Sequence, residues 1–184
     1  MLRTKRFVVA SGACLAVLSM FAPASSGQEV PSASLKEGKP FSYCCLPHKG
    51  PLTDIGAVIG DFMQAVEGQG LFASIRGTMI GVYYSSPADT KPADLAWEVG
   101  FPVAEGTAPR PPLVMKEWKW PTAAVAVHKG AYAKTGETIQ RLMDWIGAGG
   151  YAVAGPTMER YLNNPMQVKP EELLTEIWVP VKKK

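Results

Sequence analysis

The sequence has few of the side chains that bind metals, with only 2 histidines and 3 cysteines in 184 residues. His48 and His128 each lie in a His-Lys-Gly turn without a neighbouring metal ligand, so we expect both on the surface. The sequence also contains no phosphate-cradling glycine loop, no paired-cysteine zinc motif and no serine nucleophile elbow. We therefore expect no metal and no cofactor.

An excess of charge is also lacking. Without residues 1–24, which carry three basic and no acidic side chains, the chain holds 16 residues of each sign and is formally neutral. The terminal run Lys182–Lys184 is typical of a solvated tail. A neutral chain without a basic stripe predicts no nucleic-acid partner.

The first 24 residues have the three parts of an export signal. A basic start precedes an apolar run over 7–21 and a small-residue cleavage site at Ala22-Pro23-Ala24. The run is shorter than the roughly 20 apolar residues that span a bilayer, so we expect no stable membrane insertion after cleavage. The sequence predicts a signal peptide over 1–24 and a periplasmic or secreted protein.

Cysteine usage agrees with export only in part. Cys14 lies in the predicted signal, where a lipoprotein anchor is a weaker alternative because Ser11 fits the anchor pattern poorly. Cys44 and Cys45 remain, and two thiols cannot form a disulfide framework. Neighbouring positions of a strand face opposite sides, so we expect one buried and one exposed thiol, with a strained bond between them as the alternative.

The chain contains an internal repeat, which decides its fold. Lys91-Pro92, Glu98-Val99 and Pro102-Val103 recur 78 positions later as Lys169-Pro170, Glu176-Ile177 and Pro180-Val181. Upstream, His48-Lys49-Gly50 recurs 80 positions later as His128-Lys129-Gly130. We assign repeat one to 41–104 and repeat two to 113–181, within a domain over 41–184. Residues 25–40 lack periodicity and predict a flexible lead-in.

Each repeat predicts a β-α-β-β unit. Apolar residues at helical spacing mark the helices: Ile55, Val58, Ile59, Phe62, Met63 and Val66, then Ile139, Leu142, Met143 and Ile146. Strands are expected over 42–46, 79–84 and 95–103, and over 123–128, 158–162 and 173–181. One unit alone would leave half of its sheet uncovered. The fold class is therefore α+β, with a curved antiparallel sheet, two helices on one face and a central cleft.

Several motifs in order carry a resemblance to a known family. They are Tyr83-Tyr84-Ser85-Ser86-Pro87, Gly130-x-Tyr132, Trp145, Gly150-Tyr151, Gly155-Pro156, Tyr161-Leu162-Asn163-Asn164-Pro165 and Thr175-Glu176-Ile177-Trp178-Val179-Pro180-Val181. The chain resembles, over about residues 40–181, the GyrI-like or effector-binding domains of AraC-type and MerR-type transcription regulators. The resemblance implies a cleft for amphipathic, often cationic or aromatic compounds, with Glu176 as its buried carboxylate. No DNA-binding domain accompanies it in this sequence.

The residues themselves suggest where such a ligand would bind. Alternation along the last strand places Glu176 and Trp178 on one face, where a dehydrated carboxylate needs an internal partner such as Arg160 or a partner in the ligand. Glu98 is its repeat mate, and we expect it partly exposed at the edge of the cleft with small neighbours beside it. Further aromatic walls are expected from Tyr84, Tyr132 and Tyr161.

The expected function is an exported protein that binds a small organic molecule, amphipathic and cationic or aromatic, in an apolar pocket. The alternative is a hydrolase of reactive, cyclopropane-type compounds, in which Glu176 activates water and a tyrosine hydroxyl acts as acid. Porphyrin binding, as in the similar SOUL proteins, is weaker because no histidine is placed to ligate iron. The ligand and the oligomeric state are not determined by the sequence.

Overall fold

The computed structural model describes residues 33–184, so the predicted signal peptide lies outside the described residues. The helices are α1 (Ile55–Gly68) and α2 (Thr135–Ala148). The strands are β1 (Ser34–Glu37), β2 (Phe41–Lys49), β3 (Ile80–Tyr83), β4 (Ala96–Pro102), β5 (Val114–Trp118), β6 (Thr122–Lys129), β7 (Tyr151–Val153), β8 (Thr157–Tyr161) and β9 (Leu174–Lys183). Short 3-10 turns cover Leu52–Asp54, Leu71–Ser74, Pro92–Asp94, Tyr132–Lys134 and Pro170–Glu172.

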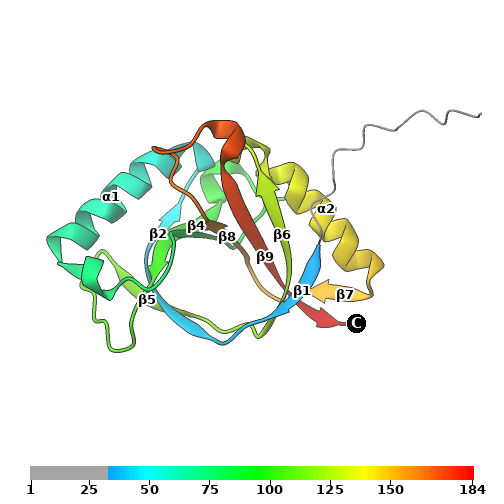
Figure 1. The fold of residues 1–184 in the computed structure, drawn as a ribbon, viewed down its shortest axis with the longest axis horizontal. Coiled ribbons are helices and arrows are strands. Elements are labelled where there is room, and N and C mark those ends of the chain that lie inside the picture. The colour runs from blue at the N-terminus through cyan, green and yellow to red at the C-terminus, as the bar shows by residue number, and fades with distance from the viewer. Residues whose placement is uncertain (1–32) are drawn as a thin grey trace, which may run out of the picture. The chain divides into compact units, whose positions relative to one another are not determined.

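The strands form one antiparallel sheet in the order β1-β6-β9-β8-β3-β4-β2-β5, with β7 paired to β9. The sheet curls, and both helices lie on its outer face (Figure 1). α1 packs on β2 and β4, whereas α2 packs on β6, β7 and β9. The two middle strands, β3 and β8, join the halves. The α+β architecture with two helices on one face is therefore confirmed.

The helix stripes pack as their spacing predicts. Val58, Phe62 and Val66 bury against β4, where Trp97 lies on the helix side of the sheet and is 2% exposed. Leu142 and the rest of the α2 stripe bury against β6 and β9 in the same way. Each buried aliphatic or aromatic side chain of this kind contributes roughly 1.5–3 kcal/mol. Each helix is therefore held by its own repeat's half of the sheet.

The expected flexible lead-in is wrong for residues 34–37, which form β1 on the edge of the sheet. All four residues of β1 are exposed, so no hydrophobic period marks the strand. Its order comes from backbone pairing with β6 rather than from a buried side. β5 and β7 were likewise not expected, and both are short strands near the sheet edges.

β1 and β5 are repeat mates that have exchanged places. Lys36-Glu37-x-Lys39 recurs 80 positions later as Lys116-Glu117-x-Lys119. β1 of the first copy pairs with β6 of the second, and β5 pairs with β2 of the first. Even the registers are equivalent, because Lys36 lies opposite Ala123 and Lys116 lies opposite Tyr43, 80 positions apart on both sides. Each repeat thus completes the sheet of the other.

Two surface expectations are wrong. Cys44 and Cys45 are both free and both buried, at 1% and 0% exposure, because β2 is covered on its helix side and on the opposite side. His128 is buried at 6%, and its Nδ1 lies 2.9 Å from the Thr138 hydroxyl on α2. His48 is part-buried beside Asp54, at 3.1 Å. The histidines help to fix each helix start to its strand.

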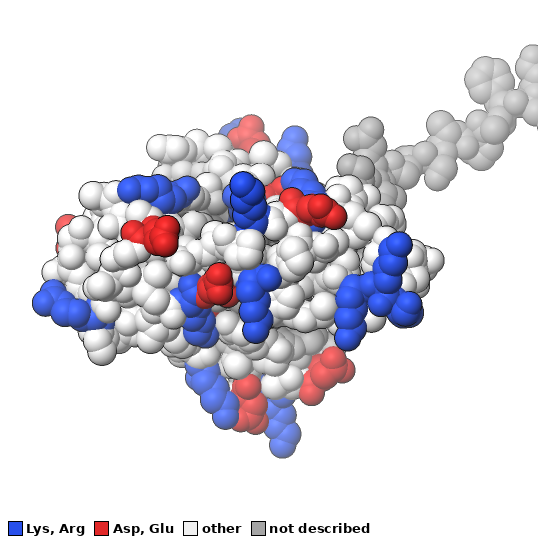
Figure 2. All heavy atoms as spheres, turned by 90° about the horizontal axis from the view of Figure 1, so that it is seen from below, with Lys and Arg blue, Asp and Glu red and all other residues white. Residues whose placement is uncertain are grey.

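The described surface carries mixed charge. Seen from below relative to Figure 1, the surface is largely uncharged, with basic and acidic side chains scattered over it (Figure 2). Within residues 33–184, neither helix has the length and hydrophobicity needed to cross a bilayer. In the same range, no three histidine, cysteine or acidic side chains lie close enough to hold a metal ion.

Candidate functional site

The face of the sheet opposite the helices, the inner face, is lined by aromatic and aliphatic side chains. Its cluster comprises Phe41, Tyr43, Cys45, Ile80, Val82, Trp118, Trp120, Met158 and Trp178. Two buried carboxylates, Glu98 on β4 and Glu176 on β9, lie on this face because each is paired across the sheet with a residue that faces inward. The predicted combination of aromatics and a buried glutamate is present.

Glu176 is buried at 7% exposure, and its charge is fully compensated. It accepts hydrogen bonds from Lys36 Nζ at 2.5 Å, from Arg160 Nη1 at 2.9 Å and from the indole Nε1 of Trp178 at 2.8 Å. Burial acts to raise the pKa of Glu176, but these donors outweigh it and hold the pKa below its usual value. Of the two expectations for Glu176, the structure contains the internal partner, Arg160.

Glu98 is 1% exposed, so the expectation of a partly exposed side chain is wrong. It accepts hydrogen bonds from Tyr43 at 2.7 Å and Tyr84 at 2.9 Å, and pairs with Lys116 at 2.5 Å. Gly100 leaves no room beside it, because a Cβ there would lie 2.5 Å from the Cys44 carbonyl oxygen. Glu98 is satisfied and enclosed.

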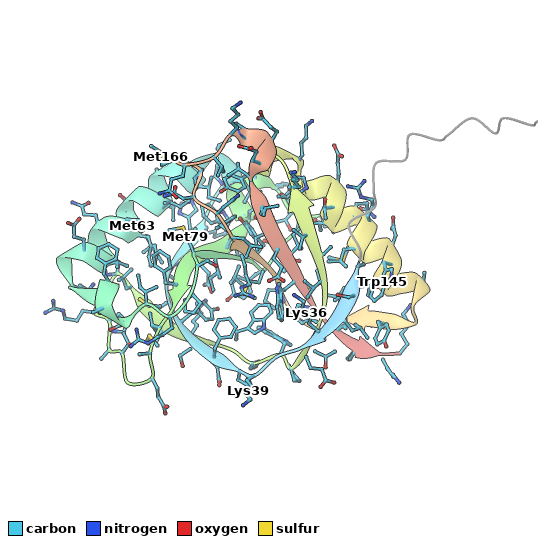
Figure 3. The ribbon with its side chains drawn as sticks, viewed as in Figure 1. Lys36, Lys39, Met63, Met79, Trp145 and Met166 are labelled. Atoms are coloured by element: carbon cyan, nitrogen blue, oxygen red, sulfur yellow. The ribbon has the colours of Figure 1, made fainter. Side chains whose placement is uncertain are left out.

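The lysine on each inner glutamate comes from the exchanged strand. Lys36 of the first copy pairs with Glu176 of the second, and Lys116 of the second pairs with Glu98 of the first. Figure 3 shows Lys36 inside the curl of the sheet, whereas Lys39 lies on the segment that leads away from β1. Neither inner glutamate therefore offers a free negative charge to a ligand.

A third carboxylate, Glu159 on β8, lies on the outer face between the helices. It is 6% exposed, and it accepts hydrogen bonds from the hydroxyls of Tyr161 at 3.2 Å and Tyr83 at 3.4 Å, which themselves lie 2.9 Å apart. The Thr135 hydroxyl at the start of α2 also acts to lower the pKa of Glu159. Among the ion pairs of residues 33–184 none includes Glu159. Loss of hydration by burial therefore raises its pKa above the ordinary carboxyl value.

The fold makes room for this cluster at one position. Gly81 is the repeat mate of Glu159, 78 positions earlier, and a Cβ on it would lie 2.8 Å from the hydroxyl oxygens of both Tyr83 and Tyr161. The ring of Tyr132 meets Tyr161 edge-on, with centroids 5.3 Å apart. We call Gly81, Tyr83, Tyr132, Glu159 and Tyr161 the interhelical floor.

The interhelical floor is reachable from solvent. α1 and α2 pack on the outer strands of their own halves rather than on β3 and β8. The three tyrosines are part-buried, so their rings shield the carboxylate while remaining in contact with solvent. Carboxylates and the faces of aromatic rings both attract organic cations, so the chemistry of the floor suits a positively charged group.

The six residues expected to contact a ligand do not meet in one place. Glu98, Glu176, Trp178 and Tyr84 belong to the inner face, with Tyr84 46% exposed at its rim. Tyr132 and Tyr161 belong to the interhelical floor. Sequence reasoning missed Glu159, although alternation along 157–161 places it on the same side of the strand as Tyr161.

The duplicated β-α-β-β fold is that of a class of small-molecule-binding domains. The family model of the GyrI-like small molecule binding domain matches residues 33–182, and the chain belongs to this family. No curated protein sequence matches the chain significantly.

Solved structures share this fold at low sequence identity. The C-terminal domain of EcmrR has a TM-score of 0.75 and 20% identity, covering 84% of this chain and 99% of that chain. A hydrolase encoded by lin2189 from Listeria innocua has a TM-score of 0.62 and 12% identity, covering 84% and 94%. SAV2435 bound to tetraphenylphosphonium has a TM-score of 0.60 and 14% identity, covering 82% of this chain and 94% of that chain. In an EcmrR–DNA complex, the match spans 59% of the EcmrR chain.

Opposite electrostatics at Glu159 and Glu176 predict opposite effects of the same substitution. Glu159→Gln should stabilise the protein at pH 7 by about 1 kcal/mol, because it removes a poorly compensated buried charge. Glu176→Gln should destabilise it by about 1–3 kcal/mol, less than a fully buried pair because Lys36 and Arg160 are part-exposed. Urea unfolding of both variants and the parent protein measures the difference.

The pH dependence separates the two further. The raised pKa of Glu159 favours its protonated form in the folded protein. Protonated Glu159 therefore costs the fold little at low pH, and the free energy of unfolding falls as the pH rises through that pKa. The lowered pKa of Glu176 gives stability above the ordinary carboxyl pKa that is lost as the pH falls. For both variants, the change in the free energy of unfolding relative to the parent should be smaller at pH 4. A change of the same sign in the two variants at pH 7 would contradict the assignment.

Proposed function

We propose that this domain binds an amphipathic, aromatic organic cation on the interhelical floor, with Glu159 as the charge that selects it. One observation carries the proposal: Glu159 is a buried carboxylate whose described partners are hydroxyls of tyrosine and threonine, without a lysine or arginine in an ion pair. Glu176, which the sequence favoured, already has Lys36 and Arg160.

The energetics favour a cation with a large apolar body. Glu159 has given up hydration without gaining an opposite charge, so a bound cation restores an interaction that the free protein lacks. Tyrosine faces attract cations, an interaction worth about 0.5–2 kcal/mol depending on desolvation. The apolar body would cover rings that are part-exposed in the free protein. Small rotations of Tyr83 and Tyr161 would open the carboxylate to the ligand.

The comparisons support this ligand class. SAV2435 shares the fold at a TM-score of 0.60 and is seen bound to tetraphenylphosphonium, a lipophilic aromatic cation. The identity of 14% carries no residue-level inference, so the choice of Glu159 depends on the geometry of this chain alone. Tetraphenylphosphonium is nonetheless a suitable first probe, with triphenylphosphine oxide as an uncharged comparison.

Calorimetric titration of the purified protein tests the proposal. Tetraphenylphosphonium should bind, and Glu159→Gln should weaken it at least tenfold, about 1.4 kcal/mol. Glu176→Gln is the matched control and should change the affinity less than threefold. Affinity should also fall as the pH is lowered through the raised pKa of Glu159, because the protonated side chain carries no charge. Equal binding of the uncharged oxide, or no effect of Glu159→Gln, would refute the proposal.

A second candidate function is hydrolysis of a reactive electrophile on the same floor. Glu159 and the Tyr161 hydroxyl, 3.2 Å apart, form the carboxylate–tyrosine pair that was expected at Glu176, where no tyrosine donates. Ionised Glu159 would take a proton from water as the water oxygen bonds to the electrophilic carbon, and Tyr161 would protonate the leaving atom as its bond to that carbon breaks. The proton would then pass from Glu159 to Tyr161 along their 3.2 Å hydrogen bond, which restores both groups. The fold shared with a Listeria innocua hydrolase supports this candidate at the level of the fold.

Turnover separates catalysis from binding. A cyclopropane-containing alkylating natural product incubated with the protein should give a water adduct by mass spectrometry, in more than one equivalent per protein. Glu159→Gln should lower the rate by about 100-fold or more, the usual contribution of a general base. Glu176→Gln should keep activity within a few-fold at temperatures where it stays folded. Stoichiometric loss of the compound would dismiss the candidate.

We also propose that the chain acts outside the cytoplasm, since the basic, apolar and small-residue segments of residues 1–24 are typical of a signal peptide. The full-length chain expressed in a Gram-negative host should be recovered from the periplasm, with a mature N-terminus at Ser25 by intact-mass measurement. Replacing Arg3, Lys5 and Arg6 with glutamate should retain the protein, uncleaved, in the cytoplasm. Cytoplasmic recovery of the unaltered chain with residues 1–24 attached would contradict export.

A further inference from the structure

The inner face holds a cavity of its own, separate from the interhelical floor because the sheet lies between them. Its volume is about 310 Å³, near the lower end of the roughly 300–1,000 Å³ that small-molecule pockets occupy. Its lining includes Lys39, Phe41, Arg76, Trp118, Arg160 and Trp178. They come from both repeats and from the segment that joins β1 to β2.

The apolar walls are flat. Phe41 and Trp118 lie nearly parallel, at 23° with ring centroids 6.5 Å apart, and Trp118 also meets Trp120 edge-on. Across the cavity, Trp178 lies beneath the guanidinium of Arg160, whose central carbon is 5.6 Å from the ring centroid. Walls of this kind favour a planar aromatic ligand over a globular one.

The polar groups of the cavity are hydrogen-bond donors. Arg160 uses Nη1 on Glu176, and among residues 33–184 its other nitrogens have no protein acceptor. Trp118 is 1% exposed, and its indole Nε1–H has no acceptor in the same range. This indole nitrogen is itself fully buried, so Trp118 contributes its ring rather than its N–H to the cavity wall. Lys39 and Arg76 add positive charge, and the lining contains no acidic side chain.

The charged side chains around the cavity also leave an excess of positive charge. Glu176 supplies one negative charge, and both Lys36 and Arg160 neutralise it, which leaves one positive charge in excess before Lys39 and Arg76 are added. Glu98 has its own lysine and adds no net charge. Glu176 acts here as a positioning residue, because it holds both Arg160 and Trp178 against the cavity.

We propose that this cavity is a second binding site, selective for planar aromatic anions such as aryl carboxylates. The ring would lie between the aromatic walls, and the carboxylate would accept from the free guanidinium nitrogens of Arg160 and from the rim cations. A guanidinium pairs with carboxylate in a fixed fork geometry, which suits this role. The proposal is independent of the interhelical floor, since the two sites lie on opposite faces and select opposite charges.

A matched pair of probes tests the selectivity. 2-Naphthoate and 2-naphthylmethylammonium have similar size and opposite charge, and their binding can be followed by quenching of tryptophan fluorescence. 2-Naphthoate should bind at least tenfold more tightly to the parent protein at 50 mM salt. Arg160→Gln should weaken 2-naphthoate at least tenfold, and Arg76→Gln about threefold, whereas Lys129→Gln on the far end of β6 should have no effect.

Further variants keep the test decisive. Should Arg160→Gln lose its fold by circular dichroism, Arg160→Lys and Trp118→Phe take its place, and each should weaken 2-naphthoate at least threefold while leaving tetraphenylphosphonium binding unchanged. Glu159→Gln should leave 2-naphthoate binding unchanged, which separates this proposal from the proposed function. Equal affinity for the two naphthyl probes, or unaltered 2-naphthoate binding in the folded Arg160 and Trp118 variants, would overturn it.

Discussion

Two glutamates buried on the inner face of the sheet require a positive charge each, and that requirement organises the domain. Burying a carboxylate without an opposite charge costs free energy, so each lysine stabilises the half-sheet in which its glutamate is buried. Lys116 reaches Glu98 and Lys36 reaches Glu176, each from the first strand of the other repeat. The same two contacts therefore neutralise the interior and hold the copies together.

Duplication, followed by divergence at a few equivalent positions of the two repeats, gives this fold two chemically different faces. Position 81 is glycine where its mate is Glu159, which creates the tyrosine-covered carboxylate between the helices. Val82 and Gly100 have Arg160 and Trp178 as mates, which give the inner cavity a cation and an aromatic wall on one side only. A symmetric backbone thus carries a carboxylate without an ion pair on its outer face and an excess of positive charge on its inner face.

Much of the fold could be predicted because it depends on local pattern. The stripe from Ile55 to Val66 specifies a helix, and alternation along the last strand places Glu176 beside Trp178. β1 escaped prediction because an edge strand without a buried side leaves no period, although Lys36-Glu37-x-Lys39 does repeat. The candidate site was predicted in its residue types, a glutamate among aromatics, but not in which glutamate lacks a counter-charge.

The duplication, the α+β class and the burial of Glu176 can be derived from the sequence alone, since they follow from periodicity and spacing. How the charges are paired depends on the tertiary structure. Glu176 is neutralised in part by Lys36, 140 positions away in the sequence, whereas Glu98 pairs with Lys116, 18 positions away on the exchanged strand. Such distant contacts leave no trace in local pattern, because strand exchange sets them through space.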